Sequence, residues 1–148
     1  MRLLSGHDET VWRWANRFFE GELAKPDWAV GVIDSDGVLR GALIGDERTP
    51  WTAEVTICGE KAFTPFVAKA FFSAFFSRYW RLEVRTTRDN KTIKRNAPKW
   101  GLKFEGTARD YFGQGRSALM FSMLKSECRW INQRVRTDGI EAKSSRAA

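Results

Sequence analysis

The chain has 148 residues, of which 43% are hydrophobic and 14% aromatic, and it carries a formal net charge of +7 at pH 7. This composition is sufficient for one hydrophobic core and excludes an intrinsically disordered chain. The sequence contains no apolar run of about 18 residues, the length needed to cross a bilayer. We therefore expect one domain over residues 1–136, a flexible tail over 137–148, no membrane association and a cytoplasmic location.

The net positive charge predicts an anionic partner, which could be a phosphate-bearing cofactor, nucleic acid or an acidic protein surface. A solvated basic face without a partner is also compatible with the same residues. The two cysteines, Cys58 and Cys128, have no metal-ligand spacing and make no disulfide framework. We expect reduced thiols and no metal.

The first half of the chain has the patterns of one helix and several strands. Val11, Ala15 and Phe18 recur at helical spacing behind possible caps at 5–10. Asp34-Ser35-Asp36-Gly37 separates two apolar runs, which is typical of a hairpin turn. In chain order we expect a strand at 3–4, a helix from the caps at 5–10 to about residue 20, and strands at 28–33, 38–44 and 52–58.

The second half begins with a strong helix start, because Thr64 supplies a capping hydroxyl and Pro65 suits the first helical position. Further on, Asn90 can cap a second helix and Gly101 can end it in the left-handed conformation. We expect helices over 65–78, 90–101 and from 123 to about 135, strands at 80–86, 102–112 and 117–123, and a turn at 113–116.

Several residues of this second half occur at a specific spacing along one helix and the strand that follows it. Asn90 opens a helix that Lys99 and Gly101 close, and Glu105-Gly106 with Arg109 lie on the following strand. This pattern resembles the GNAT (Gcn5-related N-acetyltransferase) superfamily and is closest to its ribosomal-protein alanine acetyltransferase branch. The resemblance implies an α/β (α+β) single domain with a mixed, mostly antiparallel, splayed sheet and helices on both faces.

The resemblance also implies an activity, the transfer of an acetyl group from acetyl-CoA to an amine acceptor that is a protein or a small molecule. In this family the thioester lies in the splay between the fourth and fifth strands. Glu54 is the candidate general base, with an outward-facing strand carboxylate as the alternative. Cys58 could approach the thioester or be a small buried hydrophobe. The CoA residues implied are Ile57 and Cys58 for the pantetheine arm, Gly59, Lys61, Ala62, Phe63 and Thr64 for the pyrophosphate, and Asn90 for the thioester end.

The chain departs from the family pattern in two places. The loop at 59–64 lacks paired glycines, carries the bulky Phe63 and precedes Pro65, which has no N–H. Ala97 stands seven residues after Asn90, where many members have a tyrosine that protonates the CoA thiolate. Two alternatives therefore stay open: a catalytically degenerate GNAT-fold protein that serves in interactions or in a phage virion, and a basic nucleic-acid-binding or base-modifying protein with weak, nonspecific binding.

Overall fold

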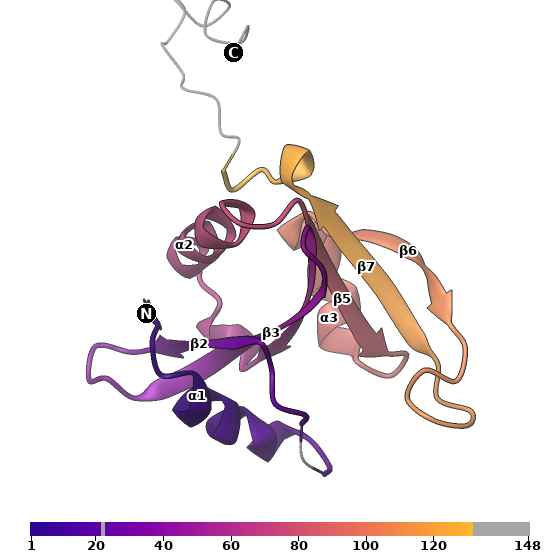
Figure 1. Cartoon of the computed structure of the whole chain (residues 1–148), viewed down its shortest axis with the longest axis horizontal. Coiled ribbons are helices and arrows are strands. Elements are labelled where there is room, and N and C mark those ends of the chain that lie inside the picture. The colour runs from indigo at the N-terminus through magenta and orange to yellow at the C-terminus, as the bar shows by residue number, and fades with distance from the viewer. Residues whose placement is uncertain (22, 132–148) are drawn as a thin grey trace, which may run out of the picture.

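The computed structural model describes residues 1–21 and 23–131, and these form a seven-stranded open sheet with three α-helices (Figure 1). The order of elements along the chain is the one predicted from the sequence. The strands are β1 (Arg2–Leu4), β2 (Trp28–Ile33), β3 (Leu39–Thr49), β4 (Thr52–Cys58), β5 (Arg81–Thr87), β6 (Lys103–Ala108) and β7 (Ala118–Leu124).

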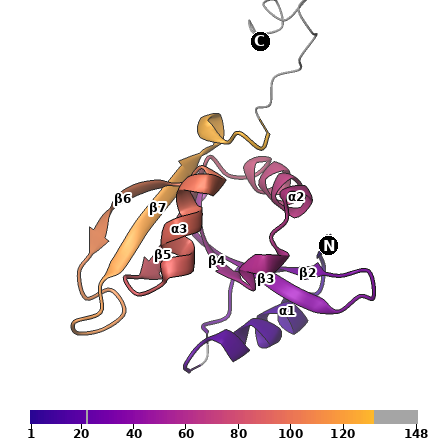
Figure 2. The same cartoon turned by 180° about the vertical axis from the view of Figure 1, so that it is seen from behind.

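The sheet has the spatial order β1-β2-β3-β4-β5-β7-β6, and every neighbouring pair is antiparallel except β4 and β5. That parallel pair is short, because only Thr52–Glu54 pairs with Arg81–Glu83. Beyond it the two strands separate, and Figure 2 shows the two halves of the sheet diverging from this junction. The predicted mixed, mostly antiparallel, splayed sheet is therefore confirmed.

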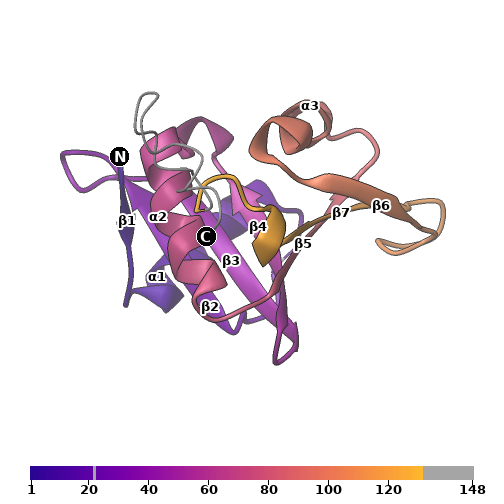
Figure 3. The same ribbon diagram turned by 90° about the horizontal axis from the view of Figure 1, so that it is seen from above.

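Helices cover both faces of the sheet, also as predicted (Figure 3). Helix α1 (Asp8–Ala15) buries Val11 and Ala15 against β2 and β3. Helices α2 (Pro65–Phe76) and α3 (Lys91–Trp100) pack on the opposite face, around a second and larger core. Four phenylalanines of α2 are buried there, namely Phe71, Phe72, Phe75 and Phe76. The two faces of the sheet on either side of the β4–β5 junction therefore carry different hydrophobic cores.

The predicted helix caps are present. The Thr64 hydroxyl accepts a hydrogen bond from the Val67 N–H at 3.3 Å, with Pro65 directly after the cap. The Asn90 side-chain carbonyl accepts from the Ile93 N–H at 3.1 Å. Gly101 ends α3 with φ of 96°, in the region that side-chain-bearing residues rarely enter. These caps hold both helices at the open end of the splay, where β4 and β5 stop.

Three element boundaries differ from expectation. The first helix ends at Ala15 and continues only as a 3₁₀ turn over Asn16–Phe18. Strand β3 runs to Thr49 instead of stopping near residue 44. The strand expected to reach residue 112 stops at Ala108, because Asp110 turns the chain with φ of 55° and its carboxylate accepts from the Gly115 N–H.

The prediction of a terminal helix is wrong for residues 125–131, where a 3₁₀ turn over Lys125–Glu127 is followed by further turns. The remainder of that helix, the domain boundary at 136 and the tail over 137–148 lie outside the described residues. Among the helices of the described ranges, none combines the length and the apolar character needed to cross a bilayer.

Candidate functional site

The splay between β4 and β5 leaves two strand edges unpaired. After Glu54, residues 55–58 of β4 have no partners on β5, and residues 84–87 of β5 have none on β4. On the other side β4 stays paired with β3 as far as Cys58. Alternate residues of a strand turn their N–H and C=O groups to the same side. The open edge of β4 can therefore bond an extended ligand arm as a further strand would.

One face of the splay, the face that α2 and α3 cover, is filled by apolar side chains and is called the helix side below. Val55 of β4 and Val84 of β5 belong to the core that also contains Phe72 of α2. Phe63, which immediately precedes the α2 cap, contacts Phe72 edge-on at 6.0 Å and Trp100 of α3 at 5.3 Å between ring centroids. These contacts fasten the loop before α2 to the end of α3.

The loop from 59 to 64 contains five of the residues predicted to bind CoA. Gly59 has φ of 69°, and a Cβ there would come within 2.3 Å of the Arg40 carbonyl oxygen, so only glycine fits. Lys61 is exposed, whereas Ala62 is buried. The positive Lys61 side chain is thus the member of this group that solvent reaches most freely.

The start of α2 has few backbone donors left for an anion. The Val67 N–H donates to the Thr64 hydroxyl and the Ala68 N–H to the Thr64 carbonyl, while Pro65 has no N–H. Within the first turn, the Phe66 N–H is the group that donates to no described residue. The Thr64 hydroxyl therefore occupies the Val67 N–H, one of the donors that a helix start can offer to an anion.

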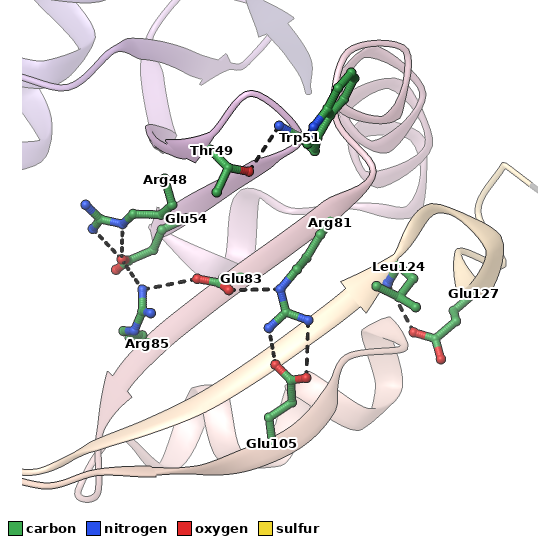
Figure 4. A network of polar contacts seen from close by, with 10 residues as sticks. All are labelled: Arg48, Thr49, Trp51, Glu54, Arg81, Glu83, Arg85, Glu105, Leu124 and Glu127. Carbon is green, nitrogen blue, oxygen red and sulfur yellow. Dashed lines mark hydrogen bonds and ion pairs between the residues drawn. The ribbon is translucent and has the colours of Figure 1, made fainter.

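The other face of the splay carries charge. The Glu54 side chain, at the last paired position of β4, is 11% exposed and is held by Arg48 of β3 and Arg85 of β5 (Figure 4). Arg48 Nη2 lies 2.5 Å and Arg85 Nη1 2.6 Å from the same oxygen, Oε1. The second oxygen, Oε2, accepts no hydrogen bond and forms no ion pair with a described residue. Oε2 is therefore the oxygen available to a ligand or to water.

The ion pairs continue along β5 and across to β6. Glu83 bridges Arg85 at 3.2 Å and Arg81 at 2.8 Å, and Arg81 also pairs with Glu105 of β6. The Arg85 guanidinium lies over the Tyr111 ring at 5.2 Å, which brings the loop between β6 and β7 to the splay. Arg85 Nε is buried without a hydrogen-bond partner among the described residues.

Asp46 is a further carboxylate on this face that the sequence analysis did not identify. It lies on β3 directly opposite Glu54, so the two side chains share one face of the sheet. Burial raises the pKa of the Asp46 carboxyl, Arg48 opposes this, and the negative charges of Glu54 and Asp27 raise it further. Its signal in the sequence was weak, because Asp46 follows the apolar run of β3 and resembles the start of a loop.

The remaining predicted site residues are distributed over different surroundings. Ile57 is half-buried on the helix side of the splay, whereas Cys58 is buried in the core beneath α1. Asn90 lies at the open end of β5, where its side-chain oxygen caps α3. The structure thus explains Asn90 and Thr64 as caps. The roles predicted for Glu54, Asn90 and the CoA residues stay predictions.

Three cavities occur elsewhere on the described part of the molecule. Their volumes are about 310, 170 and 180 Å³, and none of the three is lined by Glu54 or by the loop at 59–64. The third cavity lies at the end of β5, because Thr87 and the following Arg88 line it together with Arg116. Among the residues described, no group of three or more His, Cys, Asp or Glu side chains is arranged to hold a metal ion.

Comparison with known proteins identifies the fold. No family model and no curated protein matches the chain. Mutant forms of the spermidine/spermine N-acetyltransferase SpeG from Vibrio cholerae match its structure with a TM-score of 0.61 and 17% identity, over 73% of this chain and 71% of theirs. A GCN5-related N-acetyltransferase from Brucella melitensis matches with a TM-score of 0.58 and 20% identity, over 84% of this chain and 68% of its own.

A GNAT-family acetyltransferase from Bacillus anthracis is also similar, with a TM-score of 0.54 and 18% identity over 67% of each chain. The chain therefore has the GNAT fold, as its sequence predicted. At these identities the likeness establishes the fold alone, and the ribosomal-protein alanine acetyltransferase branch and the phage-type context stay predictions.

Proposed function

We propose that the protein is an N-acyltransferase that moves an acyl group, most simply acetyl, from a CoA thioester to an amine. The observation that carries this proposal is the β4–β5 splay, which offers an unpaired β4 edge and a carboxylate at its junction. The solved structures that share the fold are named as acetyltransferases. Cys58 and Cys128 are buried and form no disulfide, which is consistent with a cytoplasmic location.

The proposed donor site uses the backbone of β4. The pantetheine arm would bond along the open edge at Ile57 and Cys58, and the pyrophosphate would meet Lys61 and the start of α2. Binding there holds the thioester carbonyl in one orientation, and a free backbone N–H of β4 would polarise it. Asn90, at the end of β5, would lie beside the thioester end of the ligand.

The proposed acceptor site is the charged face. An amine placed there is within reach of Glu54 Oε2, while Arg48 and Arg85 hold Oε1. Glu54 would orient the amine toward the thioester by accepting its hydrogen bond, directly or through a water. The amine nitrogen then attacks the carbonyl carbon, and the C–S bond breaks to release CoA thiolate.

Two measurements test this proposal. Calorimetry with acetyl-CoA should show binding, and a thiol-release assay should show CoA formation with spermidine or with a short peptide bearing a free α-amino group. Spermidine is the first probe because the fold's solved neighbours include spermidine N-acetyltransferases. Absence of heat and of thermal stabilisation at millimolar acetyl-CoA would overturn the proposal.

A specific pair of contacts favours a second function, that of a GNAT-fold interaction protein without catalysis. Phe63 packs against Trp100, and Thr64 occupies the Val67 N–H, so the ring beside the splay and one amide of the helix start are already engaged within the protein. The same acetyl-CoA titration separates the two functions, because an interaction protein of this kind would not bind acetyl-CoA.

A further inference from the structure

We propose that Asp46 is the catalytic base of the acyl transfer, the group that takes the proton from the attacking amine. This inference rests on the proposed N-acyltransferase function and assigns a role within the same site. It stands on the position of Asp46, on the bonds that already occupy Glu54 and on the charges that surround both carboxylates.

The position follows from the register of the sheet. Asp46 pairs with Glu54 across β3 and β4, and Glu54 pairs with Glu83 across the junction with β5. Side chains directly opposite on neighbouring strands have Cβ atoms about 5 Å apart on one face. The three carboxylates therefore form a row that leads from β3 to the point where the splay opens, and Asp46 is the first of them.

The two neighbouring carboxylates are already occupied by arginines. Glu54 accepts from Arg48 and Arg85, and Glu83 pairs with Arg81 and Arg85. Asp46 is half-buried, and no ion pair or hydrogen bond of its carboxylate is present among the described residues. A carboxylate that no guanidinium holds can accept a proton without first giving up a charged partner.

The groups that face Asp46 come from three parts of the chain. Arg48 lies two residues along β3, Glu54 lies opposite on β4, and Asp27 precedes β2. Burial is the main cause that raises the pKa of Asp46, Arg48 lowers it, and the negative charges of Glu54 and Asp27 raise it further. The half-buried position that makes Asp46 costly to ionise, beside the carboxylates of Glu54 and Asp27, also makes it a suitable acceptor for the proton of an amine.

The reaction balances with the two substrates alone. The amine nitrogen forms a bond to the carbonyl carbon of the acyl-CoA, and its proton passes to an Asp46 carboxylate oxygen. The C–S bond then breaks, the sulfur leaves as a thiolate with the electron pair, and solvent protonates it. Asp46 returns its proton to solvent before the next turnover.

The test compares Asp46→Asn with Asp36→Asn, an exposed aspartate in the turn before β3. With acetyl-CoA and the better of the two acceptor probes, Asp46→Asn should lower kcat by about 100-fold or more, the size expected for a lost general base. Acetyl-CoA affinity should stay within twofold of the parent value. Asp36→Asn should leave both quantities unchanged.

Two further readouts separate a base from a residue needed only for the fold. Asp46→Asn should keep or raise the thermal midpoint at pH 7, because it removes an unpaired half-buried charge, whereas loss of a structural aspartate would lower it. Asp46→Glu should restore part of kcat and move the acidic limb of the pH–rate profile. A kcat within threefold of the parent in Asp46→Asn, or an unchanged acidic limb in Asp46→Glu, would overturn the assignment.

These outcomes are distinct from failure of the proposed function. If the parent protein neither binds acetyl-CoA nor releases CoA, the acyltransferase proposal and the role of Asp46 fail together. If the parent protein turns over and Asp46→Asn does so equally well, the role of Asp46 alone fails.

Discussion

The ring of Phe63 meets the ring of Trp100 nearly edge-on, with 5.3 Å between centroids and 63° between planes. This contact joins the loop before α2 to the last turn of α3, the two segments that flank the helix side of the splay. We infer that a CoA arm bound along β4, as proposed above, would meet the Phe63 ring. If acyl-CoA binds along β4 as proposed, we infer that it displaces the Phe63 ring from Trp100.

We predict that Phe63→Leu tightens acetyl-CoA binding. When only a fraction of the protein is competent to bind, apparent affinity falls by that fraction, so removing the obstruction should lower the apparent Kd roughly threefold to tenfold. Isothermal titration calorimetry measures this directly. Phe75→Leu is the matched control, because Phe75 is buried in the same core but contacts neither the loop nor Trp100 in the described ring contacts. Weaker binding by Phe63→Leu would show that the ring supports the ligand.

The cap of α2 gives a prediction for stability. Thr64→Ala removes the acceptor for the Val67 N–H and should lower the unfolding free energy by about 1 kcal/mol, whereas Thr64→Ser keeps a hydroxyl and should cost much less. Equilibrium urea denaturation provides both values. Equal losses in the two variants would mean that the Thr64 methyl group, and not its hydroxyl, stabilises the helix start.

The features that sequence reasoning predicted are those with local causes. Thr64-Pro65, the cap at Asn90 and the stop at Gly101 each act through bonds within a few residues, so their effect is readable without the fold. The turn at Asp34 is of the same kind, because its carboxylate accepts from the Asp36 and Val38 N–H groups. Together with the hydrophobic patterns, these signals gave the right order for the three helices and seven strands, but the terminal helix predicted after them is absent from residues 123–131.

The features that sequence reasoning missed depend on contacts between segments that are distant in the chain. Strand β3 continues to Thr49 because its polar end pairs with β4 and not because its own residues favour a strand. Asp46 is on that continuation, so the carboxylate row could not be seen before the register was known. The packing of Phe63 on Trp100 joins residues 63 and 100 and left no signal in either local pattern.

The two arginines on Glu54 lead to a prediction about folding energy. Glu54→Gln removes the buried carboxylate that the partly buried Arg85 and the exposed Arg48 share, and it should lower the unfolding free energy by roughly 2 kcal/mol, less than for a fully buried pair. Glu9→Gln is the control, because Glu9 pairs with Arg13 in an exposed position on α1 and should change stability little. Similar losses in both variants, measured by urea denaturation, would contradict the importance assigned to the ion pairs of Glu54.

Asp46 gives a prediction about pH. Its folded pKa is raised by burial above the ordinary value of 3.8, so between 3.8 and the folded pKa the native state holds a proton that the unfolded state has released. Stability from this group is greatest at low pH and falls as pH rises through the folded pKa. The unfolding free energy of Asp46→Asn, relative to that of the parent protein, should therefore rise as pH increases from 4 to 7. Urea denaturation across this range checks it, and a constant difference would contradict the raised pKa.

The basic face of α3 allows a test of the nucleic-acid alternative. Lys91, Lys94, Arg95 and Lys99 are exposed on it, and none forms an ion pair with a carboxylate in the described part of the chain. Counterion release gives duplex DNA binding a slope of about −0.9 in log affinity against log salt for each phosphate contacted. We expect weak, nonspecific DNA binding that is lost by 150 mM salt, because the contacts on one short helix are few and purely electrostatic.

Charge reversal on α3 provides the matched comparison. Lys94→Glu combined with Arg95→Glu should abolish the low-salt binding, whereas Lys69→Glu combined with Arg2→Glu changes the net charge equally at exposed positions away from α3 and should only weaken it. Fluorescence anisotropy with a labelled duplex at 20 and 150 mM salt measures each case. Acetyl-CoA binding should survive at 150 mM salt, because bonds along the β4 edge contribute besides charge. Submicromolar DNA affinity at 150 mM salt would reverse this order and make nucleic acid the first candidate partner.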